Sequence, residues 1–423
     1  MNERTHFDFG WIIVGISFII LALTYGVWYS FSVFFVALLK EFGWSRSVGA
    51  GAFSLFIVIQ SFAGPFAGGM VDRFGPRVVI VSGSLILGIG LALSSTIHAW
   101  WHFYLFFGVI TAIGLGTTGW IANTTIVHHW FQEKRGLAVG IISSGIGVGI
   151  LVCTPAAQVL INRVGWRATY QAMAFIIPLI NISMAVLFLK RPPHGPVKRL
   201  SLPGIQGRRV IDKEWGSRSW TVKEAMGTKP FWLLTFSFLV SGISTQSILT
   251  HHVAFFVDKG LEPLRASYIV GMVGIVSMGS KILWAMMSDR KGREVTYAAG
   301  VACAVCGLLS LIAFHFLALP VFSYSYALFF GMGYAVAAVL PAMITADFFA
   351  GGSYGGIFGT IMVLNGLGGA FGAWFAGFVH DHLHSYLVVF LIMIVFFLAG
   401  GYAIWIAAPR KVVGPMAGDV VEK

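Results

Sequence analysis

One lysine lies inside an apolar segment in which a charge is expensive. Lys281 falls within the run from Tyr268 to Met287, which contains no other charged residue. About 20 apolar residues are enough to cross a bilayer. A cation at membrane depth costs about 2.5 to 3.5 kcal/mol on insertion scales, and such residues usually bind an ion, move a proton or pair with an acid. Lys281 is therefore the first candidate for the chemistry of this chain.

The position of Lys281 along its segment predicts its depth. It lies eight residues before Asp289, which marks the end of the predicted helix. At 1.5 Å per residue this distance is about 12 Å, close to the middle of a hydrocarbon core roughly 30 Å thick. No acid lies within reach on the same helix or in the middle of another apolar segment. We therefore expect an anion from outside the protein as its partner; snorkelling or a structural pair with an acid is the alternative.

Two further kinds of side chain in the apolar segments could serve the same chemistry. His251 and His252 could carry a proton, because histidine titrates near neutral pH. Neighbouring helical residues point about 100° apart, so at most one of the pair faces a given site. Aromatic and amide side chains suit the wall of a pocket for a small organic acid, although each of them could equally serve bundle packing. The candidates for this wall are Tyr25, Trp28, Tyr29, Trp120, Asn123, Tyr334 and Asn365.

The elements that must hold these residues are apolar helices. The chain has 423 residues, of which 57% are hydrophobic and 10% charged, and its mean hydropathy is +0.84. Soluble domains carry about 25% charged residues, so the composition predicts an all-α integral membrane protein. We predict twelve transmembrane helices, at residues 11–38, 48–70, 78–96, 103–127, 136–161, 168–189, 231–256, 266–287, 295–316, 322–346, 354–378 and 386–407.

The net charge of +12 indicates membrane topology rather than nucleic-acid binding. With both termini cytoplasmic, the predicted inner segments hold 21 of the 28 lysines and arginines, the outer loops hold 6, and Lys281 completes the total. Cytoplasmic loops are enriched in these residues. We therefore expect a multi-pass protein of the cell (inner or plasma) membrane, in contact with lipid and with both termini inside. This count defines the predicted outer and inner sides of the protein.

One long polar stretch divides the predicted helices evenly. We expect an N-terminal six-helix half at residues 1–190, a cytoplasmic basic linker at 191–229, a C-terminal six-helix half at 230–408 and a cytoplasmic tail at 409–423. The three cysteines, Cys153, Cys303 and Cys306, lie in apolar segments and suit packing. No metal-ligand spacing and no pairing of nucleophile and base is evident, so we expect neither a cofactor, a metal nor an enzyme.

A short loop motif occurs twice. The loop after the second predicted helix reads G-x-x-x-D-R-x-G-P-R from Gly68 to Arg77, and the loop after the eighth reads A-x-x-x-D-R-x-G-R-E from Ala285 to Glu294. The two copies are 217 residues apart and occupy equivalent places in the two predicted halves. Internal repeats of this kind are typical of secondary transporters.

These motifs resemble those of the major facilitator superfamily, and three further stretches narrow the resemblance. They are D-F-G-W from Asp8, the run from Ser32 to Arg46 that contains K-E-F-G-W-S-R, and W-F-x-x-K-R-G-L-A-x-G from Trp130. Together they are similar to the monocarboxylate transporter group and its bacterial relatives, which include the oxalate/formate exchangers. The resemblance implies a fold of two pseudo-symmetric six-helix bundles.

The resemblance also implies a gate on the cytoplasmic side. In that family the loop motif locks the two halves together when the site faces outward. Asp72 would face a helix N-terminus in the other half, where an acid is favoured, and Arg73 and Arg77 would join the charge network. We expect the second copy, with Asp289 and Arg290, to be a weaker latch because Ala285 and Glu294 depart from the pattern. Setting the membrane topology alone is the alternative role of these charges.

The resemblance further implies a function for Lys281. In the family an arginine at this place in the eighth helix binds the substrate carboxylate. Of the pair His251 and His252, the resemblance favours His251 as the residue that faces the cavity. Lysine keeps the charge but loses the two-pronged grip of arginine, and it can lose its proton when buried. Lys281 and His251 are therefore the candidates for proton coupling. One buried cation matches one carboxylate, which favours a monocarboxylate such as lactate or pyruvate, carried with a proton by alternating access.

Three alternatives remain open. An oxalate/formate-type anion exchanger of the same fold would be expected to carry two buried cations for two carboxylates. A polyspecific drug exporter would be expected to carry buried acids for cationic drugs. A transporter-like sensor would bind without transporting, which the sequence cannot distinguish.

Overall fold

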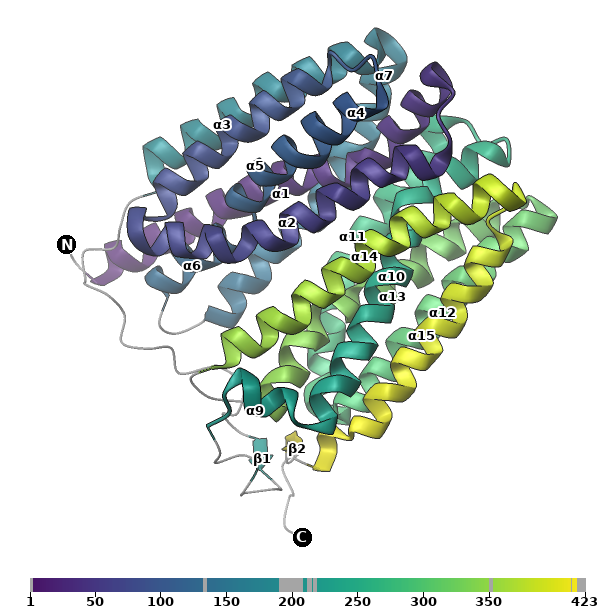
Figure 1. Cartoon of the computed structure of the whole chain (residues 1–423). Coiled ribbons are helices and arrows are strands. Elements are labelled where there is room, and N and C mark those ends of the chain that lie inside the picture. Colours follow the sequence, from purple (N-terminus) through teal and green to yellow (C-terminus); the bar gives the residue numbers. More distant parts are fainter. Residues whose placement is uncertain are drawn as a thin grey trace. The chain divides into compact units, whose positions relative to one another are not determined.

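The structure is a computed structural model that describes residues 3–131, 135–189, 208–210, 215, 219–349, 353–411 and 413–416. Helices dominate this part of the chain (Figure 1). The long elements are α1 (Glu3–Phe42), α2 (Arg46–Phe74), α3 (Pro76–Ser94), α7 (Arg135–Phe188), α10 (Lys229–Asp258), α11 (Pro263–Lys291), α12 (Arg293–Leu317), α13 (Pro320–Phe348), α14 (Tyr354–Leu383) and α15 (Leu387–Ala407). The short ones are α4 (Trp100–Phe103), the π-helix η1 (Tyr104–Thr111), α5 (Ala112–Thr118), α6 (Trp120–Trp130), β1 (Arg208–Val210), α9 (Val222–Met226), the 3₁₀ turn η2 (Pro409–Lys411) and β2 (Val413–Met416).

The expected membrane architecture is confirmed. Eleven helical segments in the described residues are long and apolar enough to cross a membrane. One of them, α7, contains Gly165 with φ 81° and ψ 163°, a conformation outside the helical region. The stretches on either side of Gly165 are each long enough to span a bilayer, which gives the twelve spans that the composition predicts. The exceptions to an all-helical fold are β1 and β2, which pair antiparallel with Val210 opposite Val413.

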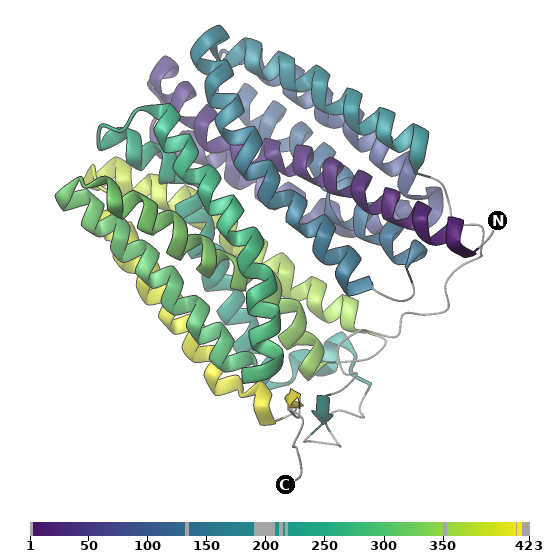
Figure 2. The same ribbon diagram turned by 180° about the vertical axis from the view of Figure 1, so that it is seen from behind.

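The described residues form two compact units. Unit 1 comprises residues 1–199, 247–275 and 373–386, and unit 2 comprises residues 200–246, 276–372 and 387–423. Each unit therefore draws on chain from both sides of the predicted linker, and α10, α11 and α14 contribute to both. Figure 2 shows the helices from behind, coloured from purple to yellow along the chain. The division of the chain into six-helix halves stays a prediction, and most of the predicted linker lies outside the described residues.

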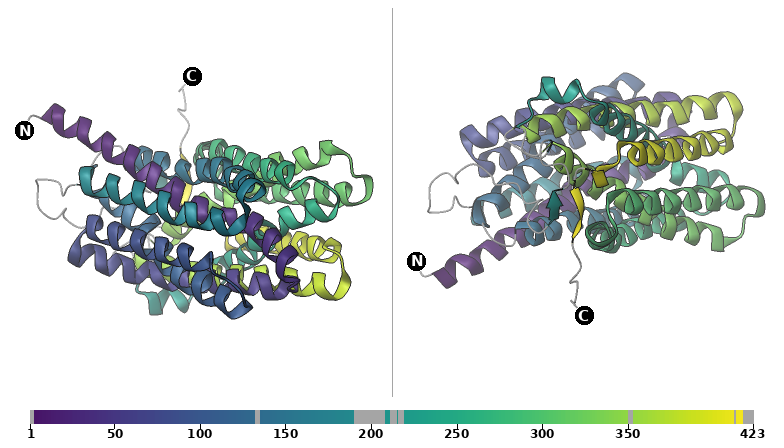
Figure 3. Two further views of the ribbon diagram at one scale, coloured as in Figure 1. Left: turned by 90° about the horizontal axis from the view of Figure 1, so that it is seen from above. Right: turned by 90° about the horizontal axis from the view of Figure 1, so that it is seen from below.

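Glycines bring α1 and α7 into backbone contact in unit 1. A Cβ at Gly145 would lie 2.5 Å from the carbonyl oxygen of Phe18, and one at Gly149 would lie 2.2 Å from that of Ala22. Small residues allow such close approach, which drives helix association in lipid. Figure 3 shows the long α1 in purple. The glycine run of α7 is therefore a packing face.

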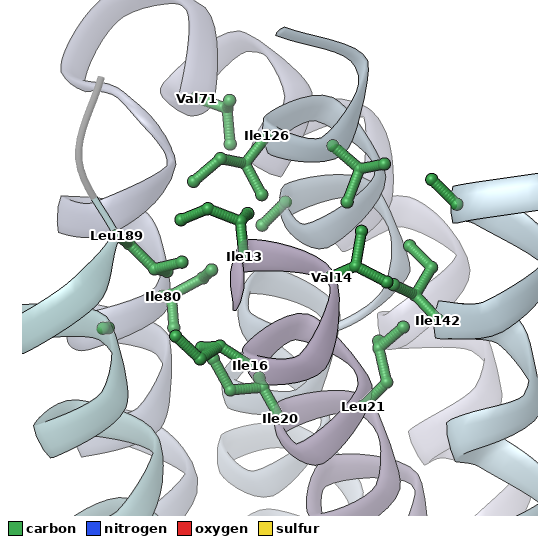
Figure 4. Close-up of a cluster of buried hydrophobic side chains, with 14 of the residues drawn as sticks. Ile13, Val14, Ile16, Ile20, Leu21, Val71, Ile80, Ile126, Ile142 and Leu189 are labelled. Carbon is green, nitrogen blue, oxygen red and sulfur yellow. The ribbon is translucent and has the colours of Figure 1, made fainter. Parts of the chain in front are cut away.

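An apolar cluster surrounds the N-terminal part of α1. Figure 4 shows Ile13, Ile16 and Ile20 of α1 among side chains from the neighbouring helices of unit 1. Val71 of α2 and Ile126 of α6 in this cluster are buried. Because lipid is itself apolar, the gain here comes from tight packing rather than from removal of water.

We expect Gly149→Ala to destabilise the protein. The new methyl group would overlap the Ala22 carbonyl and force α1 and α7 apart, and overpacking costs about 1–3 kcal/mol. A thermal-stability assay in detergent should show a clearly lower melting temperature. Gly140→Ala on the same helix is the matched control, because a Cβ there meets nothing within 4 Å. Equal melting temperatures for the two variants would contradict the predicted contact.

The fourth predicted span is interrupted twice. It runs through α4, the π-helix η1 and α5 to Gly119, whose ψ of −139° ends α5 before α6 begins at Trp120. π-Helical turns and breaks of this kind often mark functional positions. The break places Trp120 and Asn123 at the start of a new helix.

Glycines also join α12 and α13 in unit 2 (green in Figure 3). A Cβ at Gly300 would lie 2.3 Å from Val336, and one at Gly333 would lie 2.6 Å from the Ala304 backbone nitrogen. This contact fixes α13 close to α12. Gly333 directly precedes Tyr334, one of the predicted wall residues.

Candidate functional site

Lys281 lies on α11 in unit 2, ten residues before the helix ends. Its side chain is half-buried, and no hydrogen bond or ion pair joins it to another residue that the structure describes. One turn further on, the buried Trp284 donates an indole Nε1–H hydrogen bond to the carbonyl of Met332 at 2.8 Å. This bond fixes α11 to α13 next to Lys281. The geometry thus holds an ammonium group on a rigid element without a carboxylate from the described chain.

Two other predicted wall residues belong to unit 2. Tyr334 is half-buried on α13, two residues after the carbonyl that Trp284 binds. Asn365 on α14 donates its amide to the carbonyl of Phe238 on α10 at 2.6 Å. A Cβ at Gly242 would lie 2.3 Å from the Asn365 backbone oxygen. The amide nitrogen of Asn365 therefore joins two helices, which is the packing role that the sequence left open.

The predicted aromatic residues of α1 lie in unit 1. Trp28 is 7% exposed and packs edge-on against Phe53 and Phe56 of α2, with ring centroids 5.4 and 5.1 Å away. Tyr25 and Tyr29 flank it and are half-buried. A Cβ built at Gly119 would lie 3.6 Å from the Tyr25 hydroxyl. Tyr25 is thus next to the break where Trp120 begins α6, whereas Trp28 belongs to the packed interior.

Asn123 holds the break in the fourth span together. Its amide nitrogen donates to the carbonyls of Thr118 and Gly119, each at 2.8 Å, and thereby satisfies backbone groups that the break exposes. Its own Oδ1 and the Thr118 hydroxyl are buried without a hydrogen-bond partner in the described residues. Buried polar atoms are almost always paired, so this break offers acceptor capacity to water or a ligand. Trp120 beside it is half-buried.

His251 lies in unit 1 with both ring nitrogens engaged. Its Nε2 lies 2.9 Å from the carbonyl oxygen of Ala373, and its Nδ1 lies 2.9 Å from the hydroxyl of Tyr386. A carbonyl only accepts, so Nε2 carries a proton and donates it to Ala373. Both ring nitrogens of His251 are therefore hydrogen-bonded within unit 1.

The described basic residues of the first copy of the loop motif lie at the surface. Arg73 and Arg77 are exposed, and the Arg73 guanidinium lies 5.1 Å from the centroid of the Phe74 ring. The backbone of Asp72 lies in the last turn of α2, but its side chain lies outside the described residues. Gly75 follows with φ 85°, and Gly292 takes φ 93° at the equivalent place in the second copy. Both copies therefore use glycine to turn sharply between two helices.

The second copy forms a buried ion-pair network within unit 2. Arg293 and Asp347 are both 4% exposed, and the Arg293 Nε donates to the Asp347 carboxylate at 2.8 Å. Arg293 also donates to Ser288 at 2.6 Å and to Asp289 at 3.1 Å. Asp289 is thus placed in a network, whereas Arg290 is exposed.

The acid at the end of the second copy is bonded as well. Glu294, which replaces a basic residue of the pattern, is buried and accepts from the backbone and side chain of Arg410 at 2.8 and 3.2 Å. Sequence reasoning missed Arg293, Asp347 and Arg410. Arg293 was visible as a basic residue directly after the Gly292 turn. Of its two acidic partners, however, one is 54 residues away and the other lies four residues earlier, on the preceding helix.

No group of three or more histidine, cysteine, aspartate or glutamate side chains in the described ranges is arranged to hold a metal ion. The polar features instead include the half-buried Lys281, a broken helix and the hydrogen-bonded networks around His251 and Arg293. Together with twelve apolar spans and a repeated turn motif, they define a multi-span membrane protein with the architecture of secondary transporters.

The chain belongs to the Major Facilitator Superfamily, whose family model matches residues 17–372. It is 26% identical over 367 residues to the oxalate:formate antiporter of Oxalobacter formigenes, a match that covers 81% of this chain and 83% of that protein. It is also 26% identical over 282 residues to monocarboxylate transporter 13 of Rattus norvegicus, covering 66% of this chain and 61% of that longer protein.

A solved structure shares the fold. A bacterial homologue of the human lysosomal transporter Spinster, in an inward-facing and unoccupied conformation, superposes with a TM-score of 0.73 over 97% of this chain and 98% of its own. At 13% identity this likeness concerns the fold alone. The suspected membership in the superfamily, close to monocarboxylate and oxalate/formate transporters, is confirmed.

Proposed function

We propose that this protein is a secondary transporter of small monocarboxylates of the lactate or pyruvate type, working by alternating access and coupled to protons. The observation that carries the proposal is Lys281, a half-buried ammonium inside an apolar helix with no carboxylate partner among the described residues. A cation in such a place calls for a counter-charge. A substrate carboxylate supplies one, and its departure with a proton leaves little net charge in the membrane.

The pairing of Arg293 supports a single carboxylate. Arg293 is a buried arginine in the same unit as Lys281, but Asp347 already neutralises its charge, so it offers no second cation for a substrate. A substrate with two carboxylates would need a second cation next to Lys281. The Tyr334 hydroxyl, in the same unit as Lys281, is a polar group that could donate a hydrogen bond to a remaining substrate oxygen, and its ring suits an apolar tail.

An exchange mechanism is the second candidate. The relative that is named an oxalate:formate antiporter favours it, because that match covers more of this chain than the match to the rat transporter does. Exchange of one anion for another would need no change in the protonation of Lys281 or His251 during the cycle. Substrate class and coupling are thus separate questions.

Transport by reconstituted protein separates the two candidates. Proteoliposomes without internal anion should take up radiolabelled lactate when the outside is acidified, because a co-transported proton drives entry. Symport predicts accumulation that collapses with a proton ionophore. A strict requirement for internal carboxylate would instead establish exchange, and absence of flux under both conditions would favour a sensor.

A further inference from the structure

The N-terminus of α2 is held by an acid from a distant helix. The Asp381 carboxylate, in the last turn of α14, accepts hydrogen bonds from the backbone nitrogens of Arg46 and Ser47, each at 2.8 Å. The first turn of a helix has unpaired N–H groups and a partial positive charge, so an acid stabilises it. All three residues belong to unit 1. Asp381 therefore fastens α14 to the beginning of α2.

A glycine makes this approach possible. Gly377 lies one turn before Asp381 on α14, and a Cβ there would be 2.8 Å from the backbone of both Arg46 and Ser47. No real Cβ tolerates that distance to backbone atoms, which cannot rotate away as a side chain can. The backbones of α2 and α14 thus touch directly, and Asp381 is positioned above the contact.

The side chain of Arg46 extends the contact to α10. Its Nη2 donates to Asp258 at 2.6 Å, and its Nη1 donates to the Tyr386 hydroxyl at 2.7 Å. The Tyr386 hydroxyl is in turn hydrogen-bonded to His251 Nδ1, 2.9 Å away. Arg46 is thus the centre of a continuous chain of hydrogen bonds between α2, α10 and the segment after α14.

A second contact line lies between α7 and α11 in the same unit. A Cβ at Gly274 would lie 2.7 Å from the carbonyl oxygen of Gly147 and 2.6 Å from the Ile150 Cβ atom. Gly271 lies one turn away, and a Cβ there would be 3.3 Å from the Leu151 carbonyl oxygen. Two pairs of helices, each from opposite sides of the linker, are therefore in close contact in unit 1.

We propose that Asp381, Arg46 and Gly377 form an outer latch, which holds the predicted outer side closed and must open once in each transport cycle. The proposal rests on the transport function proposed above. The proposed latch also makes Asp381 the outer counterpart of Asp72, the acid of the first loop motif. Asp72 lies in the last turn of α2 and is expected to face a helix N-terminus on the inner side, whereas Asp381 lies in the last turn of α14 and caps α2 on the outer side. Asp72 would then stabilise the conformation that is closed on the inner side, and Asp381 the conformation that is closed on the outer side.

The distance between spin labels on the outer ends tests the latch. Labels on cysteines replacing Lys40 and Lys259, with the three native cysteines changed to alanine, report opening on the predicted outer side. Asp381→Asn removes the charge while keeping the shape. We expect it to raise the ratio of long to short distances about tenfold, as for loss of one charge-assisted hydrogen bond. Gly377→Ala should act in the same direction by steric exclusion.

Arg167→Gln is the matched control. Arg167 also lies on the predicted outer side and pairs with an acid, Glu41, but both residues precede the linker. This variant should leave the distance distribution unchanged. The latch is wrong if Asp381→Asn and Gly377→Ala both keep the distribution of the parent protein, or if Arg167→Gln shifts it equally. The measurement needs no substrate, so it remains decisive even if the protein does not carry monocarboxylates.

Discussion

Lys281→Gln is expected to reduce carboxylate uptake about 100-fold, because it removes the charged partner of the substrate while keeping nearly the same length of side chain. The helix itself should be unaffected, since the contact that fixes α11 to α13 is made by Trp284 and not by Lys281. Uptake into proteoliposomes, normalised to the amount of inserted protein, is the measurement. Lys40→Gln is the control, because Lys40 is exposed at the end of α1.

Lys281→Arg separates the two roles of the lysine. Arginine keeps the positive charge and pairs well with a carboxylate, but it cannot be deprotonated in a protein. If Lys281 carries the coupled proton, the arginine variant should still exchange substrate while losing accumulation driven by a pH gradient. If His251 carries the proton, both activities should persist. Near-normal uptake by Lys281→Gln would remove Lys281 from the binding site altogether.

Asp347→Asn is expected to destabilise the protein strongly. It leaves the Arg293 guanidinium buried at 4% exposure with its closest acid neutralised. Removing one partner of a buried ion pair costs about 3–5 kcal/mol. Reversible unfolding in mixed micelles should therefore show a large loss of stability. Adding Arg293→Met to the same variant should recover part of it by removing a buried charge that is left with Asp289 alone, 3.1 Å away.

Glu41→Gln provides the comparison for an exposed pair. Glu41 and Arg167 are about 40% exposed, and such pairs contribute about 0–1 kcal/mol. The difference between the two variants measures the effect of burial. A loss for Asp347→Asn no larger than that for Glu41→Gln would show that the network around Arg293 is solvated and does not hold the second loop motif.

Hydropathy predicted the spans well because membrane helices must be long and apolar throughout. The boundary between the fifth and sixth spans also followed from the sequence, and Gly165 supplies the turn there. The break at Gly119 could not be predicted, because a π-helical segment and an interrupted helix keep the same apolar composition. Only the hydrogen bonds from Asn123 reveal that the fourth span is divided.

The sequence also could not predict which polar residues meet. His251 and Tyr386 are 135 residues apart, and Arg46 and Asp381 are 335 apart. The eleventh predicted span ends at residue 378, whereas α14 continues to Leu383. Those extra turns carry Asp381 to the start of α2. Pattern alone identifies a charged residue, but its partner depends on helix packing.

The sharpest measurement is the thermal stability of the purified protein with lactate and with oxalate at matched ionic strength and pH, for the parent chain and for Lys281→Gln. A ligand that binds the folded state raises its melting temperature. If Lys281 is the single cation that pairs with one substrate carboxylate, lactate should stabilise the parent chain more than oxalate does. Neither acid should stabilise Lys281→Gln. Stronger stabilisation by oxalate, or equal stabilisation of the two proteins by lactate, would contradict the assignment of Lys281 as the single carboxylate anchor.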